Sequence, residues 1–167
     1  MTTSPALPTV GILMGSISDL EIMKGAKAAL EHFEVSSELK VLSAHRTPEE
    51  TIQYAKAAIS QGLKVLIAGA GGAAHLPGVL AALTTLPVIG VPIAREPLQG
   101  QDALLSIVQM PKGIVVATVG INNSWNAGLL AAQILAIHSI ELQDKLIQYK
   151  EQLRKEVLAK KIPPHVA

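Results

Sequence analysis

Residues 64–78 read KVLIAGAGGAAHLPG, and this stretch decides the fold. Val65 to Ala68 form a short unbroken apolar run, which is typical of a strand covered on both faces of a sheet. Three glycines follow within four residues, and glycine lets the backbone turn tightly and approach a ligand closely. After His75, Pro77 favours the first turn of a helix. The stretch predicts a buried strand that carries a glycine-rich loop and one imidazole to the edge of a sheet, as one wall of a small-molecule site.

The same stretch also fits a dinucleotide-binding fingerprint, because Gly69, Gly71 and Ala74 have the spacing G-x-G-x-x-A. That fingerprint requires an acidic residue about 20 residues further on, which holds the ribose. The next predicted strand ends at residues 90–92, Gly-Val-Pro, and offers no acid there. The sequence therefore argues against a dinucleotide site.

The composition of the 167-residue chain narrows the classes of function. A net charge of +1 and 2% aromatic residues provide neither the positive surface nor the stacking side chains of nucleic-acid binding. Cysteine is absent, which excludes thiolate catalysis and thiolate metal sites. Residues 1–8 lack the basic start and apolar core of a signal peptide. We therefore expect a single domain over residues 1–167, located in the cytoplasm, with no nucleic-acid partner.

Two long segments contain no Asp, Glu, Lys or Arg, residues 65–94 and 113–140, and must be weighed as membrane spans. Prolines and a glycine cluster interrupt the first, and three asparagines and a serine interrupt the second. Each segment is better explained as a strand, a turn and a helix than as a membrane span, so we expect no membrane partner. Hydrophobic residues reach 49%, which suggests that some apolar surface is hidden between subunits.

Strands and helices alternate along the chain, which favours a parallel sheet covered on both faces. Right-handed crossovers leave few arrangements, and for five strands the order 2-1-3-4-5 is the commonest. We therefore expect a three-layer α/β/α domain with its core over about residues 9–139, followed by a C-terminal helical arm. The predicted strands cover residues 9–14, 36–42, 65–68, 87–91 and 114–119, and the helices about 20–30, 47–61, 76–85, 102–108, 126–139 and 141–160.

Local patterns predict how individual helices start and pack. Ser18 and Glu21 have capping-box spacing, and Thr47 is expected to cap a helix that begins with Pro48, with Glu50 closing the box. The helix over 126–139 carries no charged residue, so we expect it to be buried.

The last predicted helix differs because it carries an apolar stripe and a charged side. Pairs at i,i+4 join Glu141 to Lys145 and Glu151 to Lys155 on the solvated side. Such a stripe can pack on its own domain or on a neighbouring chain, and we favour the neighbouring chain. Its members are Leu142, Leu146, Tyr149, Leu153 and Val157.

In the predicted arrangement, ligands bind beyond the carboxyl ends of the strands, where the strand order reverses. That rule brings together three loops, residues 15–19, 43–46 and 69–75. The first offers serine hydroxyls at a helix N-terminus, which favours a phosphate. Arg46 can bind the same phosphate with two parallel hydrogen bonds, whereas Asp19 is expected to turn toward sugar hydroxyls.

Each of these residues also has a plainer interpretation. Ser18 and Asp19 can serve only as helix caps, and Arg46 only as a surface charge. His45 can be a loop histidine with satisfied hydrogen bonds, and His75 can hold the glycine loop in shape. A histidine metal site lacks the HxxxH or HxH spacing that would support it, so we expect no metal.

Six motifs occur in order and together closely resemble class I 5-(carboxyamino)imidazole ribonucleotide mutases of purine biosynthesis. The resemblance covers roughly residues 10–139, and its second and third motifs are the most specific. The motifs are GSxSD (15–19), SAHRTP (43–48), AGAGGAAHLPG (68–78), GVP (90–92), SIVQMP (106–111) and NAGLLA (126–131).

The resemblance implies a flavodoxin-like subunit of a homo-octamer with active sites between subunits, acting on a ribonucleotide without metal, ATP or organic cofactor. It implies that the enzyme moves a carboxylate from the exocyclic amine to ring carbon 4. By motif, Ser16, Ser18 and Arg46 match phosphate ligands, Asp19 matches the ribose ligand, and His45 matches the general acid–base. The implied substrate-binding residues are Gly15, Ser16, Ser18, Asp19, Ser43, Ala44, Arg46, Ala70, Gly71, Gly72, Ala73, His75 and Leu76.

These roles agree with the chemistry of a carboxylate shift. Loss of carbon dioxide needs a proton delivered to the amine, and recapture by carbon 4 needs a proton removed, so one imidazole can serve both steps near neutral pH. The uncharged side chains of Ala73, Ala74 and Leu76 suit a trapped carbon dioxide, which stays close to the ring.

Two other functions stay open. Class II relatives carboxylate aminoimidazole ribonucleotide with free carbon dioxide, but that class carries lysine at the position of Arg46 and lacks the full GGAAHLPG run. A non-catalytic nucleotide-sensing module can use the same fold. The chain departs from the family pattern at Trp125, where a smaller residue is expected, and Arg95 lies in a variable stretch.

Overall fold

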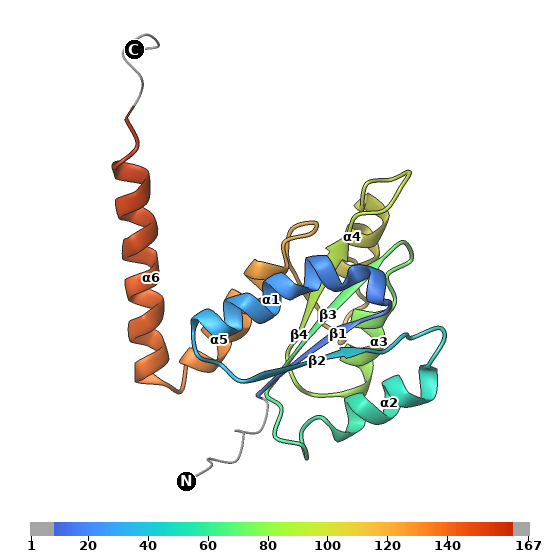
Figure 1. The fold of residues 1–167 in the computed structure, drawn as a ribbon. Helices are drawn as coiled ribbons and strands as arrows, with labels where there is room; N and C mark the ends of the chain where they lie inside the picture. Colours follow the sequence, from blue (N-terminus) through green and yellow to red (C-terminus); the bar gives the residue numbers. More distant parts are fainter. Residues whose placement is uncertain (1–8, 162–167) are drawn as a thin grey trace. The chain divides into compact units, whose positions relative to one another are not determined.

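The structure is a computed structural model that describes residues 9–161; the expectation about residues 1–8 lies outside that range. Five strands form one all-parallel sheet in the order β2-β1-β3-β4-β5 (Figure 1). This confirms the predicted order and sheet type. The strands are β1 (Val10–Met14), β2 (Ser37–Val41), β3 (Val65–Gly71), β4 (Val88–Ile93) and β5 (Ala117–Thr118).

Helices cover both faces of the sheet, which confirms the three-layer α/β/α fold. Helix α1 lies against one face, and α2, α3 and α4 lie against the other (Figure 1). The helices in the described part of the chain are the 3-10 helix η1 (Ile17–Asp19) and α1 (Leu20–His32), α2 (Pro48–Ala57), α3 (Leu76–Leu83), α4 (Gln101–Val108), α5 (Ser124–Ala136) and α6 (Ile140–Leu158).

The chain divides after Ala132 into two compact units. The first holds the whole sheet, and the second holds the end of α5 and all of α6. That a single domain spans residues 1–167 remains a prediction.

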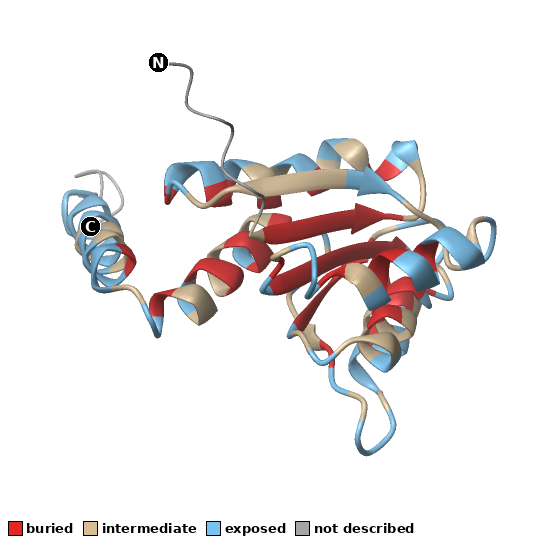
Figure 2. Cartoon of the chain, turned by 90° about the horizontal axis from the view of Figure 1, so that it is seen from below, coloured by how far each residue is buried: buried red, intermediate tan, exposed pale blue. Residues whose placement is uncertain are grey.

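The central strands carry the core of the first unit. Every residue of β1 and β4 is buried, and the first six residues of β3 are buried (Figure 2). An unbroken apolar run suits this environment because side chains on both faces meet a helix layer. The edge strand β2 has no buried residue, in agreement with its partly alternating sequence.

Three strand boundaries differ from the sequence prediction. Strand β3 continues through the glycines to Gly71, and β4 continues to Ile93, because each still finds hydrogen-bonding partners in the neighbouring strand. Strand β5 is only two residues long instead of the predicted 114–119. A turn around Gly113, whose φ is 99°, precedes it, and the register gives β4 partners only for Ala117 and Thr118.

Both predicted capping boxes are wrong in their details. Ser18 does not cap α1, because the residue before that helix is Asp19, whose side chain makes no capping bond. Ser16 caps the preceding η1 instead: its side chain accepts a hydrogen bond from the backbone N–H of Ser18 at 3.3 Å. Pro48 does begin α2, but the side chain of Thr47 makes no capping bond to that helix. Its hydroxyl bonds back to Ser43 instead, so it stabilises the preceding turn.

Helix α5 is less buried than its lack of charge predicts. Ala127 and Ala131 are fully buried, but Leu129 and Leu130 are only half-buried and Asn126 is exposed. A charge-free helix therefore leaves apolar surface uncovered by its own chain.

The start of α5 packs unusually close to α1. Ser124 donates a hydrogen bond to the backbone carbonyl of Ile22, and Gly128 lies directly against α1. A Cβ atom at Gly128 would lie 2.5 Å from the carbonyl oxygen of Ala26 and 2.8 Å from the Cβ of Ala29. The absence of a side chain at Gly128 is therefore required for this helix contact.

Gly128→Ala is expected to lower the free energy of unfolding by about 2 kcal/mol, because the two helices must move apart. Gly120→Ala is the matched control: its Cβ would meet only Asn123, at 3.8 Å, and its effect should stay within about 0.5 kcal/mol. Urea unfolding at one fixed protein concentration measures both. Equal effects of the two substitutions would show that the contact between α1 and α5 tolerates a methyl group.

Helix α6 belongs to the second unit and is amphipathic as predicted. Lys145 pairs with Glu141 at 3.0 Å, but Glu151 pairs with Arg154 rather than with Lys155. In the stripe, Leu142 is buried while Val157 is 64% exposed, so the described chain does not cover the far end. Among the helices of residues 9–161, none is both long and apolar enough to cross a membrane.

Candidate active site

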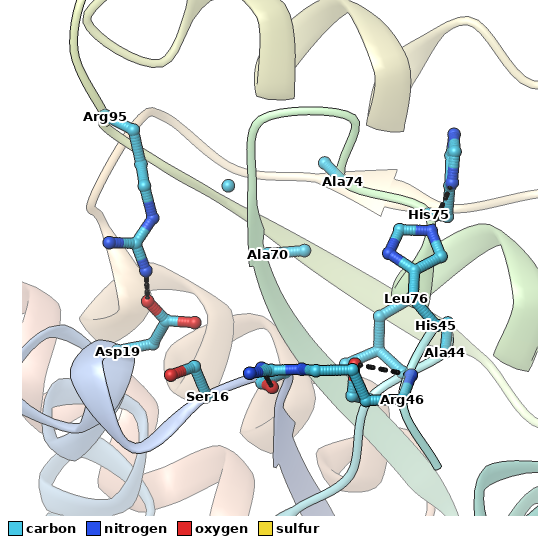
Figure 3. Close-up of a pocket in the computed structure, with 13 residues that line it drawn as sticks. Ser16, Asp19, Ala44, His45, Arg46, Ala70, Ala74, His75, Leu76 and Arg95 are labelled. Atoms are coloured by element: carbon cyan, nitrogen blue, oxygen red, sulfur yellow. Dashed lines mark hydrogen bonds and ion pairs between the residues drawn. The ribbon is translucent and has the colours of Figure 1, made fainter. Parts of the chain in front are cut away.

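A cavity of about 300 Å³ opens at the carboxyl ends of the central strands, at the predicted position (Figure 3). All predicted site residues line it except Ser18, Gly72 and Ala73. Two further residues, Ala74 and Arg95, also line it. The lining residues are Gly15, Ser16, Asp19, Ser43, Ala44, His45, Arg46, Ala70, Gly71, Ala74, His75, Leu76 and Arg95.

The loop after β1 brings two hydroxyls together. Ser18 donates a hydrogen bond from its hydroxyl to the Oγ atom of Ser16 at 2.9 Å. Ser16 lines the cavity itself, and Ser18 is linked to it through this bond. The pair forms a small polar corner at the start of η1.

The loop after β2 is a tight turn that presents His45 and Arg46. Thr47 closes the turn, because its hydroxyl accepts from the N–H of Ser43 at 2.8 Å and donates to the Ser43 carbonyl at 3.1 Å. The Arg46 guanidinium reaches across to donate to the carbonyl of Gly15 at 2.5 Å. This contact holds the first two loops together beside Ser16 (Figure 3).

The two site histidines are in direct contact. The Nε2 atom of His45 lies 2.7 Å from the Nδ1 atom of His75, and the rings are nearly perpendicular at 88°. A single N–H lies between the two nitrogens, so one ring donates and the other accepts. The partner of the His75 imidazole is therefore His45, and not the glycine loop as the plainer interpretation expected.

The stretch that decides the fold forms the cavity floor as strand and turn rather than as one loose loop. Ala70 and Gly71 still belong to β3. The turn follows at Gly72 and Ala74, which both adopt left-handed backbone with φ of 63° and 48°. Ala74 is buried and faces the cavity, whereas Ala73 is exposed. This stretch therefore contributes Ala70, Ala74 and Leu76 to the apolar surface of the cavity.

Asp19 lies at the end of the cavity away from His45 and His75 (Figure 3), and it is nearly fully buried. Burial raises the pKa of its carboxyl group, while the nearby Arg95, the Ser18 hydroxyl and Arg46 favour the charged form and oppose the rise. Arg95 makes an ion pair with this carboxylate and also donates to the Ser18 Oγ at 3.0 Å. The cavity thus carries two arginines and one aspartate, an excess of positive charge that suits an anionic ligand.

Arg95 was not included in the site predicted from the sequence. Ala74 was named as an uncharged side chain near the carbon dioxide, but not among the substrate-binding residues. Arg95 lies two residues after the end of β4, so the rule that sites form at the carboxyl ends of strands applies to it as well. Arg95 was correctly placed in a loop, but only three other loops were expected at the site, and Arg95 was assigned to a variable stretch. In the described residues no group of three or more His, Asp or Glu side chains is arranged to hold a metal ion.

Known proteins are similar to this chain in sequence and in fold. Residues 9–156 match the AIR carboxylase family. The N5-carboxyaminoimidazole ribonucleotide mutase of Pyrococcus abyssi is 60% identical over 149 residues, which cover 89% of this chain and 86% of that protein. The protein of the same name from Synechocystis is 59% identical, covering 95% and 89%. The crystal structure of Treponema denticola PurE is 29% identical with a TM-score of 0.82, covering 90% of this chain and 94% of that one.

A longer relative contains the same region. The phosphoribosylaminoimidazole carboxylase of Candida glabrata is 54% identical over 92% of this chain, which corresponds to 27% of that protein. The fold and the cavity define a flavodoxin-like α/β protein with its ligand site at the carboxyl ends of a parallel sheet. The chain belongs to the AIR carboxylase family.

Proposed function

We propose that this chain converts N5-carboxyaminoimidazole ribonucleotide into 4-carboxy-5-aminoimidazole ribonucleotide, an isomerase step of purine biosynthesis. Relatives at 59% and 60% identity are named as the corresponding mutase. One observation carries the proposal: a single cavity holds His45 in contact with His75, two arginines, and an apolar wall. These are the parts that a carboxylate shift on an anionic ribotide requires.

In this proposal the phosphate binds at the corner between the first two loops. Arg46 and Ser16 supply donors there, and Ser18 acts through its hydrogen bond to Ser16. Asp19 accepts from the ribose hydroxyls. The imidazole ring then lies against Ala70 and Gly71, whose side chains are no larger than a methyl group. The remaining proposed binding residues are Gly15, Ser43, Ala44, Gly72, Ala73, His75 and Leu76.

The chemistry is a decarboxylation followed by recapture. The bond between the carboxylate carbon and the exocyclic nitrogen breaks, its electron pair stays on nitrogen, and His45 delivers a proton there. Carbon dioxide stays against Ala74 and Leu76 while carbon 4 forms a new bond to it. Carbon 4 then loses its proton to His45, which restores the starting state. His75 orients His45 through the 2.7 Å contact between their rings.

We also propose that the chain forms a homo-octamer. Apolar side chains on the first unit, among them Ile17, Leu98, Leu105 and Val115, are each more than half exposed, and a neighbouring chain would cover them. Light scattering should then report eight times the 17.5 kDa of one chain. A cytoplasmic location is proposed because a ribonucleotide with several charges does not cross a bilayer unaided.

Supplying each candidate substrate tests the function. The purified protein should convert the N5-carboxy substrate in medium that contains ¹³C-bicarbonate, and most of the product should lack the label. Turnover of aminoimidazole ribonucleotide with bicarbonate, but not of the N5-carboxy compound, would instead establish a carboxylase. Tight binding of the ribotide without turnover of either compound would establish a sensing module.

A further inference from the structure

Arg95 reaches the cavity from the fourth strand, and no predicted role accounts for it. Its side chain crosses over Gly71: a Cβ atom at Gly71 would lie 2.9 Å from Cγ and 3.0 Å from Nε of Arg95. The lack of a side chain on β3 thus opens the route along which the guanidinium reaches the loop after β1. Arg95 forms one wall of the cavity, opposite the histidines (Figure 3).

The contacts of Arg95 occupy only one side of the Asp19 carboxylate. Its Nη2 atom pairs with Oδ1 of Asp19 and donates to Oγ of Ser18, and that hydroxyl lies 3.4 Å from the same Oδ1. The second oxygen of Asp19 points toward the part of the cavity where Ser16 and Arg46 lie (Figure 3). One carboxylate oxygen is therefore held by the protein, and the other is directed to the ligand space.

The two side chains differ sharply in exposure. The Asp19 side chain is 4% exposed, whereas that of Arg95 is 45% exposed. A carboxylate so deeply buried needs a charged partner to stay ionised and fixed in one orientation. Arg95 provides that partner from the edge of the cavity, which is the arrangement expected of a residue that acts through Asp19.

We propose that Arg95 is a positioning residue for sugar recognition: it holds Asp19 so that the oxygen facing the cavity accepts hydrogen bonds from the ribose hydroxyls. This inference rests on the proposed function, which supplies a ribotide as the ligand. The phosphate has its own cation in Arg46, on the opposite side of Ser16 from Arg95 (Figure 3).

Calorimetric titration of variants with two ligands tests this role. The ligands are the product ribotide and its 2′,3′-dideoxy counterpart, which retains the phosphate and the ring. Arg95→Met should weaken binding of the ribotide about tenfold, and Arg95→Lys should recover part of the loss. The dideoxy ligand should bind the wild-type protein about tenfold more weakly than the ribotide does, and Arg95→Met should weaken it no further.

The matched control is Lys24→Met, which removes an ion pair of 2.6 Å with Glu21 on α1, outside the cavity. It should leave the affinity for both ligands unchanged. An equal loss for both ligands in Arg95→Met would overturn the inference, because it would mean direct contact with the anion or a general structural effect. Unchanged binding of the ribotide in Arg95→Met would overturn it as well.

A pH series separates positioning from simple packing. Removing Arg95 removes a cation that favours the ionised Asp19, so ribotide binding by Arg95→Met should begin to weaken at a higher pH than wild-type binding as the pH falls from about 8 to about 5. Arg46, His45 and His75 line the cavity and Ser18 contacts Asp19 in both proteins, so the difference isolates Arg95. Identical pH profiles would contradict the proposal. Wild-type turnover is measured in parallel: its absence would defeat the proposed function, while the two affinity ratios still judge Arg95.

Discussion

Replacing His45 by asparagine is expected to lower kcat by about a thousandfold, with the affinity for the product ribotide changed less than about threefold. The asparagine amide can place a hydrogen-bonding group near the position of the imidazole, but it cannot take up or release a proton near neutral pH. In the proposed mechanism one imidazole serves both proton transfers, so the two halves of the reaction fail together. Steady-state rates and calorimetry measure the two quantities.

The matched control is His138→Asn, which changes an exposed histidine outside the cavity and should retain full activity. A His45→Asn variant as active as the wild type would contradict the assignment of His45 as the general acid–base. Loss of binding in parallel with activity would instead show that His45 holds the ligand, because a residue needed only for proton transfer changes kcat without changing the affinity.

Arg46→Met is expected to raise KM about a hundredfold and to change kcat less than about threefold. The guanidinium lies against the loop after β1, where its bond to the Gly15 carbonyl fixes it next to Ser16. Methionine keeps most of the length of the side chain but offers no donor, so the phosphate loses its charged partner. The remaining groups for the chemistry, His45 and His75, stay in contact with each other.

Arg154→Met controls for the loss of a positive charge, because Arg154 pairs with Glu151 on the exposed side of α6. It should leave KM unchanged. Initial rates over a range of substrate concentrations give both constants for each variant. A Michaelis constant for Arg46→Met equal to that of the wild type would remove Arg46 from phosphate binding.

The parallel sheet was predictable because most of its strands are short apolar runs separated by helical patterns. Strands that are covered by helices on both faces allow few other arrangements. Strand ends were less predictable. Gly69 and Gly71 look like turn residues, yet they continue β3, since the neighbouring β4 still supplies hydrogen-bonding partners. The edge strand β5 has one neighbour only, so the six residues predicted for it yield two paired positions.

The position of a site residue was predictable where the residue lies next to a strand end along the chain. The hydrogen-bonding partner of a site residue was less predictable, because it depends on contacts between distant parts of the chain. The position of Asp19 in the cavity follows from the loop after β1, but its ion pair depends on Arg95, 76 residues away in sequence. Thr47 was assigned to its helix because local spacing fits a cap, and only the folded turn shows that it bonds to Ser43. Partners that are distant in sequence leave no periodic signal for a pattern to detect.

The close packing at the glycines of β3 has a consequence for redesign of the cavity. Gly71 cannot be exchanged to reshape the cavity, since a Cβ there would collide with Arg95, and a Cβ at Gly69 in the same strand would collide with Met23. An engineer who wants the protein to accept a bulkier heterocycle must therefore change other lining residues, such as Leu76 or Arg95. Selections that randomise the glycines should return almost only the parental sequence.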